Sequence, residues 1–556
     1  MPKNITVNII GAGDNATAQV PHGISLYDLS LQYAHVCQRP ILVAKVDNEL
    51  NDLSRPLLYD STVEFLDITD PNGFRAYQRG VSFMMVYAVK AILGKKTRVV
   101  IAHSINKNYY CELPDLKVPI TENLLQEIEQ YMRDTAEKDV AIERLSLPRE
   151  SGIKIAEDLG LYDKVSLLKY QHLHTVNFYK LNWLYNYFYG EIAPRTGRLN
   201  QFKLVPRANG FMLQFPSVAH NYDLEDLSPE NRLTEVFTEN KQWVRIMKTD
   251  TVGALNDKLC QDGSDEIIRV AEALHEKKVA MLADQIMSEN RTIVLIAGPT
   301  SSGKTSLAHR LGVQLRVNGA IPHIMSLDNY YLDRAFCPRD EFGNFDFETI
   351  KAIDTDLIAR HLQALLKGEE VHIPTFNFLT GKPEYKGNKL KFNPRDVLIM
   401  EGIHGLNDLI SEGVAPSDKF KIFISALTQI NVDDHNRIPT SDTRLLRRIV
   451  RDFRTRGSTA AQTISMWPSV QRGEAKYIYP CQEYADAFFN SALVYEMGVL
   501  KQYAEPLLFG IGSHEPEYTE ARRLIKFLAS FLSVPSETIP QNSILREFVG
   551  GSSFYH

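Results

Sequence analysis

Apolar and polar positions divide the chain into stretches with different patterns. Before residue 75, short and mainly apolar runs predict strands, and residues 25–34 have the apolar spacing of a helix that Ser25 can cap, with Asp28 at the capping-box position. The predicted strands are residues 5–10, 18–20, 41–47 and 62–68. Such a mixture in a short segment indicates a small α+β unit.

Longer elements are predicted between residues 75 and 290. Residues 81–93 indicate a mostly buried helix, and residues 121–145 an amphipathic helix with a charged face. Strands are predicted at 97–105 and within 202–216, and a further helix at 264–289. The polar segment 221–232, which contains a proline, is predicted to be a linker.

From Arg291 onward, apolar strands alternate with helical patterns. The predicted strands are 292–298, 322–328, 397–402 and 421–426, and the predicted helices are 304–317, 349–367 and 442–455. This alternation is typical of a parallel β-sheet with crossover helices.

Composition limits the class of protein. With 556 residues, about three or four domains are expected. A hydrophobic share of 44%, a charged share of 23% and a net charge of −6 are those of a folded globular protein without an overall basic field for nucleic acid. The five cysteines form no Cys-x-x-Cys pair, so neither a disulfide framework nor a thiolate zinc site is indicated.

Two features of the sequence bear on where the protein is located. The first ten residues lack a basic start followed by a long apolar core, so no signal peptide is expected. The longest apolar stretch, Val81–Val89, is far shorter than the ~20 residues of a membrane helix. We therefore expect a cytoplasmic protein.

The strongest motif is a phosphate-binding loop. It follows an apolar strand and precedes a helical segment, as the motif requires. Its glycines allow backbone N–H groups to surround phosphate oxygens, and the helix N-terminus adds partial positive charge. Lys304 would reach the β- and γ-phosphates and Thr305 would ligate Mg²⁺. The predicted nucleotide-binding residues are Gly298, Pro299, Thr300, Ser301, Ser302, Gly303, Lys304, Thr305 and Ser306.

Two acidic residues lie where further strands of the same sheet end. Asp328 is predicted to orient an acceptor hydroxyl and take its proton during phosphoryl transfer, the alternative being an Asp that caps a turn. Glu401 is predicted to hold Mg²⁺ through water, the alternative being a buried structural acid.

An arginine-rich segment follows at 442–456. We expect it to form a lid that clamps the triphosphate, with Arg444 and Arg448 acting in catalysis. The alternatives are a solvated basic face and an RNA contact. The six arginines are Arg444, Arg447, Arg448, Arg451, Arg454 and Arg456.

Residues 291–510 resemble the uridine kinase / phosphoribulokinase family. The matching motifs, in the family's order, are GPTSSGKT, SLDNYYLDR, FDFETI, IPTFNF, MEGIHG, DTRLLRRIVRD and YADAFFN. The resemblance implies a P-loop kinase fold and transfer from ATP to an alcohol, with Asp328 as base and with Tyr331 and Asp346 contacting the acceptor. Phe376 and Gly381 stand where uridine kinases have a base-reading Tyr and His, which places the pyrimidine acceptor in question.

The N-terminal half resembles other modules. Residues 1–70 resemble a TGS domain of the β-grasp type, through VPHGISLYDLS. Residues 75–220 resemble the editing domain of threonyl-tRNA synthetases, through Pro194, TGRLNQFKL and GFML. In that resemblance, no His lies where the first ligand pair belongs, and Phe188 and Ile192 stand at the Cys and His positions of the second. Because neither can donate an electron pair to a metal, we expect the editing chemistry to be lost.

Two further features of this half have alternative interpretations. His172 and His174 lack a third ligand and are interpreted as structural or surface residues rather than as a metal site. An aromatic run is interpreted as core rather than as a base-stacking platform, and Lys203 and Arg207 add little positive charge near it. The run contains Phe178, Tyr179, Trp183, Tyr185, Tyr187, Phe188 and Tyr189.

These observations lead to a domain division and a function. We expect a multi-domain α/β chain: a TGS-like unit at 1–70, an editing-like unit at 71–225, a helical linker at 226–290, a kinase domain at 291–510 and an extension at 511–556. The expected function is transfer of the γ-phosphoryl group of ATP, with Mg²⁺, to a hydroxyl of a nucleoside. The alternatives are a sugar or polyol kinase and an RNA- or ribosome-associated ATPase.

Overall fold

The computed structural model describes residues 4–11, 15–105, 107–217, 221–225, 231–339, 343, 345–377 and 380–554. Residues 226–230, within the predicted linker, lie outside the described residues. No helix in the described ranges is both long and apolar enough to span a bilayer.

The N-terminal unit is a mixed five-stranded sheet with one helix, in the strand order β2-β1-β5-β3-β4. The predicted β1–β2 hairpin is confirmed, and β1 pairs in parallel with β5. Ser25 caps α1 by accepting from the Asp28 backbone N–H. The short strand β4, which has a polar sequence, was not predicted. The bounds are β1 (Asn4–Ile10), β2 (Ala16–Pro21), α1 (Leu26–Gln32), β3 (Val43–Val46), β4 (Glu49–Asp52) and β5 (Ser61–Leu66).

A long buried helix, α2 (Pro71–Leu93), leads into the next region. It begins well before the predicted start at Val81, because Asp70 caps it and Pro71 occupies its first turn. α3 (Glu122–Glu137) ends earlier than predicted, since residues 143–148 form a strand. The other bounds are β6 (Val100–Ile105), β7 (Asn108–Glu112), β8 (Glu143–Pro148), α4 (Arg149–Asp158), α5 (Tyr162–Lys169), β9 (Thr175–Leu181), β10 (Leu184–Tyr187), β11 (Lys203–Arg207) and β12 (Gly210–Gln214).

These strands form two sheets, β10-β9-β8 and β11-β12-β7-β6. The aromatic run lies mainly inside them: Phe178, Tyr179, Tyr187, Phe188 and Tyr189 are buried. The interpretation of this run as core is therefore confirmed.

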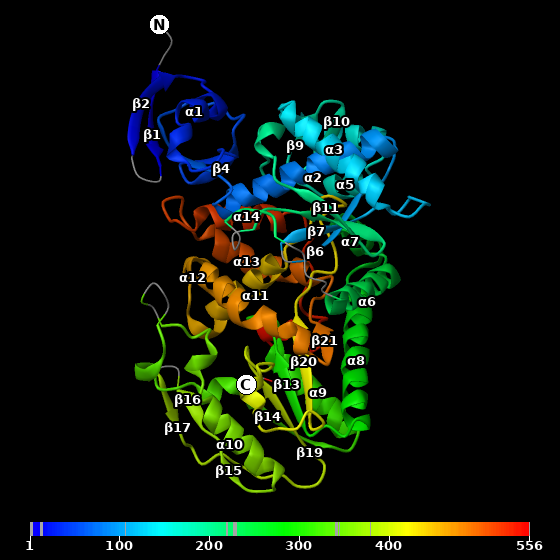
Figure 1. Cartoon of the computed structure of the whole chain (residues 1–556), viewed down its shortest axis with the longest axis vertical. Helices are drawn as coiled ribbons and strands as arrows, with labels where there is room; N and C mark the ends of the chain where they lie inside the picture. The colour runs from blue at the N-terminus through cyan, green and yellow to red at the C-terminus, as the bar shows by residue number, and fades with distance from the viewer. Residues whose placement is uncertain are drawn as a thin grey trace.

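Three helices connect this region to the C-terminal half: α6 (Asn231–Met247), α7 (Val252–Asp262) and α8 (Asp265–Ser288). Val279, Leu282 and Ile286 of α8 are buried in the same apolar cluster as Val294 and Leu311 of the C-terminal half. Figure 1 shows α8 running along the side of the C-terminal sheet.

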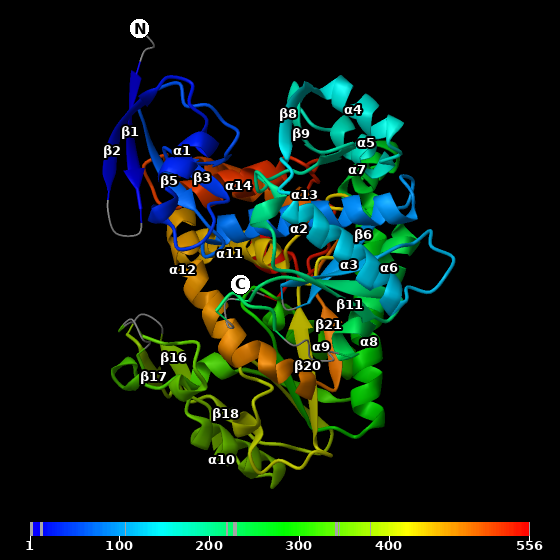
Figure 2. The same cartoon turned by 45° about the horizontal axis from the view of Figure 1, so that its top comes forward.

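The C-terminal half is built on a parallel sheet in the order β14-β19-β13-β20-β21 (Figure 1). Figure 2 shows β20 and β21 of this sheet from a second direction. The predicted alternation of strands and helices is present, and β21 adds an edge strand. The bounds are β13 (Ile293–Ala297), α9 (Lys304–Val317), β14 (Ile321–Ser326), α10 (Thr355–Leu366), β19 (Asp396–Glu401), β20 (Lys419–Ser425), α11 (Thr440–Arg456), α12 (Ala460–Gly473), β21 (Ala487–Asn490) and α13 (Glu496–Phe509). Two small hairpin-like sheets pair β15 (Val371–His372) with β18 (Lys389–Leu390) and β16 (Thr375–Asn377) with β17 (Lys382–Glu384).

The N-terminal half contacts the segment 427–438 that leads into α11. Arg98 forms a two-pronged ion pair with Asp434 at 2.7 and 2.9 Å, and buried Lys164 pairs with Asp433 at 2.6 Å. A second contact runs from Arg75 through Glu520 and Arg523 of α14 (Tyr518–Leu528) to the first turn of α11. Figure 1 shows α13 and α14 between the N-terminal elements and α11.

Candidate active site

The strand order of the parallel sheet brings three separate segments to one edge. β19 lies between β14 and β13, and Glu401 at the end of β19 is level with Ser326 of β14 and Ile296 of β13. Asp328 follows β14, and the loop 298–303 follows β13. Since ligands of open α/β sheets bind at the carboxyl ends of the strands, this edge is the candidate active site.

The loop 298–303 has the conformation of a phosphate cradle. Gly298 passes so close to the Ile424 carbonyl that a Cβ would overlap it, and Gly303 has φ +89°. The hydroxyls of Ser301 and Ser302 are buried without a hydrogen-bond partner. α9 begins directly afterwards, and the first N–H groups of a helix lack partners within it. These donors fit the phosphate oxygens of a nucleotide.

Lys304 and Thr305 begin α9 beside this cradle. The Lys304 Nζ donates to the carbonyls of Gly298 (3.0 Å) and Pro299 (3.2 Å), so it folds back over the loop. Burial lowers the pKa of Lys304, while Glu401 and Asp328 act in the opposite direction. The Thr305 Oγ1 donates to Glu401 at 3.3 Å, which brings the two predicted Mg²⁺-holding residues together.

The two carboxylates of the site are held in an environment that disfavours their charge. Although Asp328 is exposed at the surface, desolvation by the protein around it raises its pKa, and Lys304, Arg456 and Arg451 oppose this rise. Burial, and then the charge of Asp328, raise the pKa of Glu401 to about 7. Asp328 does not cap its turn, because the Ser326 hydroxyl accepts from the Asp328 backbone N–H. Perturbed carboxylates facing a lysine are typical of functional sites.

Two of the predicted lid arginines face the protein interior instead of the open edge. Arg444 is 2% exposed and pairs with Glu474, with 2.8 Å between Nη2 and Oε2; its other nitrogen donates to the Thr300 carbonyl. Arg447 is fully buried and donates to Ser301 O at 3.3 Å. The geometry differs from the predicted phosphate clamp at Arg444, because both guanidiniums are engaged by carboxylates and loop carbonyls.

The other arginines of α11 are less enclosed. Arg448, Arg451 and Arg456 all pair with the buried Asp452, at 3.1, 2.8 and 3.6 Å. The charges of Arg451 and Arg456 oppose the rise in the pKa of Asp328, so both arginines face the site. Arg454 donates to Phe548 O at 2.7 Å and so turns toward the C-terminal extension. The arrangement assigns different positions to residues that look equivalent in the sequence.

The predicted acceptor residues lie together beyond Asp328. The Tyr331 hydroxyl donates to Phe347 O at 3.1 Å, and its ring packs on Phe376 with 5.6 Å between centroids. The Asp346 carboxylate accepts from the Glu348 backbone N–H at 3.1 Å and from the Tyr477 hydroxyl at 3.2 Å. A carboxylate and an aromatic pair at this point suit a hydroxyl-bearing acceptor.

The two positions that depart from the uridine kinase pattern offer no polar side chain to a base. Phe376 is 7% exposed. Gly381 has φ +71°, and the Arg334 side chain packs against it. Its carbonyl accepts from the Arg334 backbone N–H at 2.8 Å.

Similarity to known proteins supports this assignment of the site. The sequence profile of the "Phosphoribulokinase / Uridine kinase family" matches residues 293–496. A uridine kinase from Chloroflexus aurantiacus is 30% identical over 206 residues, which are 36% of this chain and 88% of that protein. The chain belongs to the phosphoribulokinase/uridine kinase family.

The remainder of this kinase-family chain has a different similarity. A threonine–tRNA ligase from Acetivibrio thermocellus is 28% identical over 199 residues, or 36% of this chain, and the match lies in the N-terminal region. The match spans only 31% of the ligase. The chain thus joins a region similar to a threonine–tRNA ligase to a kinase-family domain.

Among solved structures, a protein described as a possible uridine kinase from Bacillus stearothermophilus is 17% identical and covers 38% of this chain and 98% of its own, with a TM-score of 0.27.

Three polar residues beside the acceptor group had no predicted role. His404 is 2% exposed, and burial lowers its pKa to about 4, while a hydrogen bond with the Glu348 backbone and the charge of Asp346 act in the opposite direction. Burial, and then Glu474, raise the pKa of Glu348 to about 7. Tyr477 binds Asp346, as described above. His404 and Glu348 occur inside the motifs MEGIHG and FDFETI, so the motifs themselves were the available signal.

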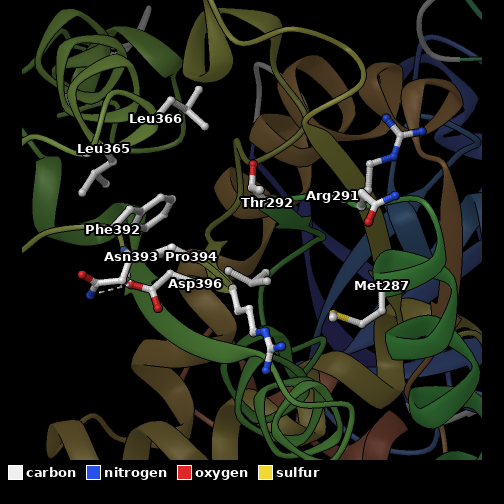
Figure 3. Close-up of a pocket in the computed structure, with 13 residues that line it drawn as sticks. Met287, Arg291, Thr292, Leu365, Leu366, Phe392, Asn393, Pro394 and Asp396 are labelled. Carbon is white, nitrogen blue, oxygen red and sulfur yellow. Dashed lines mark hydrogen bonds between the residues drawn. The ribbon is translucent and has the colours of Figure 1, made fainter.

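A separate cavity of about 470 Å³ lies at the opposite edge of the kinase-family sheet (Figure 3). Thr292, which precedes β13, and Asp396, which begins β19, line it. The Asn393 backbone N–H donates to Asp396 at 2.8 Å, and Phe392 stands beside them. Because the phosphate loop follows the other end of β13, this cavity is not part of the candidate active site.

In the ligase-like region, buried apolar side chains occupy the positions that correspond to metal ligands. Phe188 and Ile192 are 3% and 1% exposed, and the Phe188 ring packs edge-on against Phe83 at 5.6 Å. His172 and His174 are exposed residues before β9. Across the described ranges, no three His, Cys, Asp or Glu side chains are grouped so as to hold a metal ion.

Proposed function

We propose that residues 291–510 form a kinase domain that transfers the γ-phosphoryl group of ATP to a hydroxyl of a small acceptor. The supporting observation is the convergence of Lys304, the Thr305–Glu401 pair and Asp328 at one edge of the sheet. ATP would lie on residues 298–306, whose backbone N–H groups and the hydroxyls of Ser301 and Ser302 fit its phosphates.

Positive charges near the phosphate loop and on α11 would neutralise the triphosphate. Lys304 is already held over the loop by the carbonyls of Gly298 and Pro299, within reach of the β- and γ-phosphates. Thr305 and Glu401 would hold Mg²⁺, which when bound supplies charge neutralisation to the phosphates. Arg448, Arg451 and Arg456 would approach from α11.

Asp328 would act on the acceptor. Its carboxylate accepts the proton of the acceptor hydroxyl as the oxygen bonds to the γ-phosphorus and the bond from that phosphorus to the β-bridging oxygen breaks. Tyr331 and Asp346 would hold the acceptor so that this hydroxyl faces Asp328. The raised pKa of Asp328 supports the role, since a weaker acid is a better proton acceptor.

Two classes of acceptor follow from different observations. The names of the relatives support a nucleoside, whose ribose Asp346 would hold and whose base would stack on the Tyr331–Phe376 pair. A neutral sugar or polyol is the second candidate. It is favoured because Phe376 and Gly381 supply no polar partner for a base edge, whereas Glu348 Oε2 is buried without a partner near the acceptor residues.

For the N-terminal half we propose a recognition or regulatory role without editing chemistry. The division is a TGS-like β-grasp unit at 1–70, an editing-like unit at 71–225 and connecting helices at 226–290, followed by the kinase domain and an extension at 511–556. The apolar Phe188 and Ile192 at the ligand positions support the loss of editing. The ligase similarity supports RNA as the class of molecule to test there.

The test is ATP consumption by the full chain with nucleosides, free sugars and polyols, comparing wild type with Asp328→Asn. We expect the variant to bind ATP normally and to lose about 10²–10⁴-fold in turnover. Asp356→Asn, at an exposed position in the first turn of α10, is the matched control.

Turnover of uridine or cytidine would support the nucleoside acceptor, and turnover of sorbitol or inositol alone would support the polyol. Unchanged turnover in Asp328→Asn would remove the base role. Hydrolysis stimulated by tRNA and by no small acceptor would support the RNA-associated ATPase instead.

A further inference from the structure

The C-terminal extension packs directly on the phosphate-binding loop. The kinase-family match ends at residue 496, so the extension lies outside it. Ile544 is fully buried against Gly303, where a Cβ would lie 2.6 Å from its Cγ2. Residue 303 must therefore remain a glycine for the loop and the extension to coexist.

Within this extension, Glu547 reaches the first turn of α9. The Ser306 hydroxyl donates to the Glu547 carboxylate at 2.7 Å. Ser306 directly follows Thr305, and the charge of Glu547 acts on the pKa values of both Lys304 and Glu401. An acidic residue from outside the family domain is thus placed among the groups that would bind ATP.

The segment that carries Glu547 is firmly anchored. Ile544, Leu545 and Phe548 are each 0% exposed. The Arg546 Nη2 donates to the carbonyls of Ser536 and Ile539, both at 2.7 Å.

Two arginines of α11 also bind the segment. The Arg454 Nη1 donates to Phe548 O at 2.7 Å, and the Arg447 guanidinium lies 5.0 Å from the centre of the Phe548 ring. Because the segment is buried and hydrogen-bonded in this way, we expect it to stay packed beside the site rather than to dissociate from it.

We propose that Glu547 is a positioning residue of the ATP site: it holds the Ser306 hydroxyl and with it the first turn of the phosphate-binding helix. This inference rests on the proposed ATP site at residues 298–306. The physical reason is that helix N–H groups bind phosphate well only when they are preorganised. The extension would then be required for nucleotide binding, although it lies outside the family domain.

The opposite role would be competition, in which the negative charge of Glu547 repels the phosphates. The two roles predict different effects of a neutral side chain that can still accept a hydrogen bond. Under positioning, Glu547→Gln keeps the acceptor for Ser306 and Glu547→Ala loses it. Under competition, both substitutions strengthen ATP binding, because both remove the charge.

The experiment is calorimetric titration of the full chain with Mg·ATP, in the absence of any acceptor. We expect Glu547→Ala to weaken ATP binding about 10–100-fold, the usual effect of losing a hydrogen bond to a charged group, and Glu547→Gln to stay within about threefold of wild type. Glu537→Gln, an exposed glutamate in the same extension, is the control and should match wild type.

Unchanged ATP binding in Glu547→Ala, or tighter binding in both variants, would overturn the proposal. A double-mutant cycle with Ser306→Ala tests the route: if the bond carries the effect, the double variant binds ATP no worse than Glu547→Ala. The comparison of ATP affinities remains valid if Glu547→Ala is less stable, because the folded fraction of each variant is measured and the affinity is calculated for the folded protein. Since ATP binding is read without an acceptor, failure to phosphorylate any acceptor would count against the proposed function and not against this role.

Discussion

Arg447 and Glu496 form an ion pair inside the fold, with 2.9 Å between the guanidinium Nε and the carboxylate Oε2. The two side chains are 0% and 4% exposed. Because Arg447 also donates to the Ser301 carbonyl, the ion pair is connected directly to the phosphate loop and helps to hold it in place. An arginine that looks like part of a lid in the sequence is thus a structural support in the fold.

Arg447→Met should destabilise the protein by about 3–5 kcal/mol, because the substitution leaves the Glu496 carboxylate buried without a counter-charge. The measurement is the free energy of unfolding in urea. A loss below about 1 kcal/mol would contradict the structural role.

Arg451→Met is the contrasting substitution on the same helix. Its partner Asp452 keeps the ion pairs with Arg448 and Arg456, so we expect little change in the free energy of unfolding. Turnover should instead fall about 10²-fold or more, because a cation facing Asp328 and the phosphates is removed. Equal effects of the two substitutions on stability and turnover would show that the positions of these arginines do not separate their roles.

Gly303→Ala and Gly319→Ala test the contact between the loop and the extension. Both glycines have positive φ, +89° and +86°, but a Cβ at Gly319 meets nothing within 4 Å, whereas one at Gly303 meets Ile544. Gly319→Ala should therefore cost only the backbone strain, about 1–2 kcal/mol in unfolding experiments. Gly303→Ala should lower the free energy of unfolding further and should also weaken ATP binding. Adding Ile544→Ala should restore part of the lost ATP binding. No recovery of ATP binding in the double variant would mean that the contact with Ile544 is not what limits residue 303.

The raised pKa of Glu348 predicts a pH dependence of stability. In the unfolded chain this carboxyl titrates near its usual 4.5, whereas in the folded protein its pKa is about 7. Between these values the folded state binds more protons, so stability falls as the pH rises from about 4.5 to 7 and levels off above. Glu348→Gln should reduce this dependence of stability on pH. The free energy of unfolding of the variant, relative to that of wild type, should therefore be higher at pH 8 than at pH 5.

Urea unfolding at the two pH values checks this, with Glu412→Gln at an exposed position as the control. A slope that is the same in Glu348→Gln and wild type would exclude Glu348 as the titrating group.

Coupling between the two halves is tested at Arg98 and Asp434. Arg98→Ala leaves the buried Asp434 without its two hydrogen bonds and should cost about 1–3 kcal/mol. A double-mutant cycle with Asp434→Asn should give a coupling energy of about 0.5–3 kcal/mol in urea unfolding. Lys96→Ala, at an exposed neighbouring position, should have no measurable effect. Independent unfolding of the two halves, unaffected by either substitution, would contradict this coupling.

Much of the fold followed from local patterns. The strand–loop–helix at 293–317 was predicted within a residue, because a fully apolar strand followed by glycines and an amphipathic helix has few alternatives. The start of α2 was missed because its first turns carry polar residues that bury only against other segments. β4 was missed because a short polar strand is recognisable only by its pairing with β3.

The sequence by itself determined the family motifs, the order of the strands along the chain and the residue types at the end of each strand. Only the tertiary structure decided which side chains meet. Six arginines of one segment were indistinguishable by spacing, yet burial separates Arg444 and Arg447 from Arg451. Glu547 lies 241 residues from Ser306 along the chain, and no local pattern connects them. The physical reason is that hydrophobic periodicity and turn chemistry act over a few residues, whereas charge pairing and desolvation depend on packing between segments that are distant in sequence.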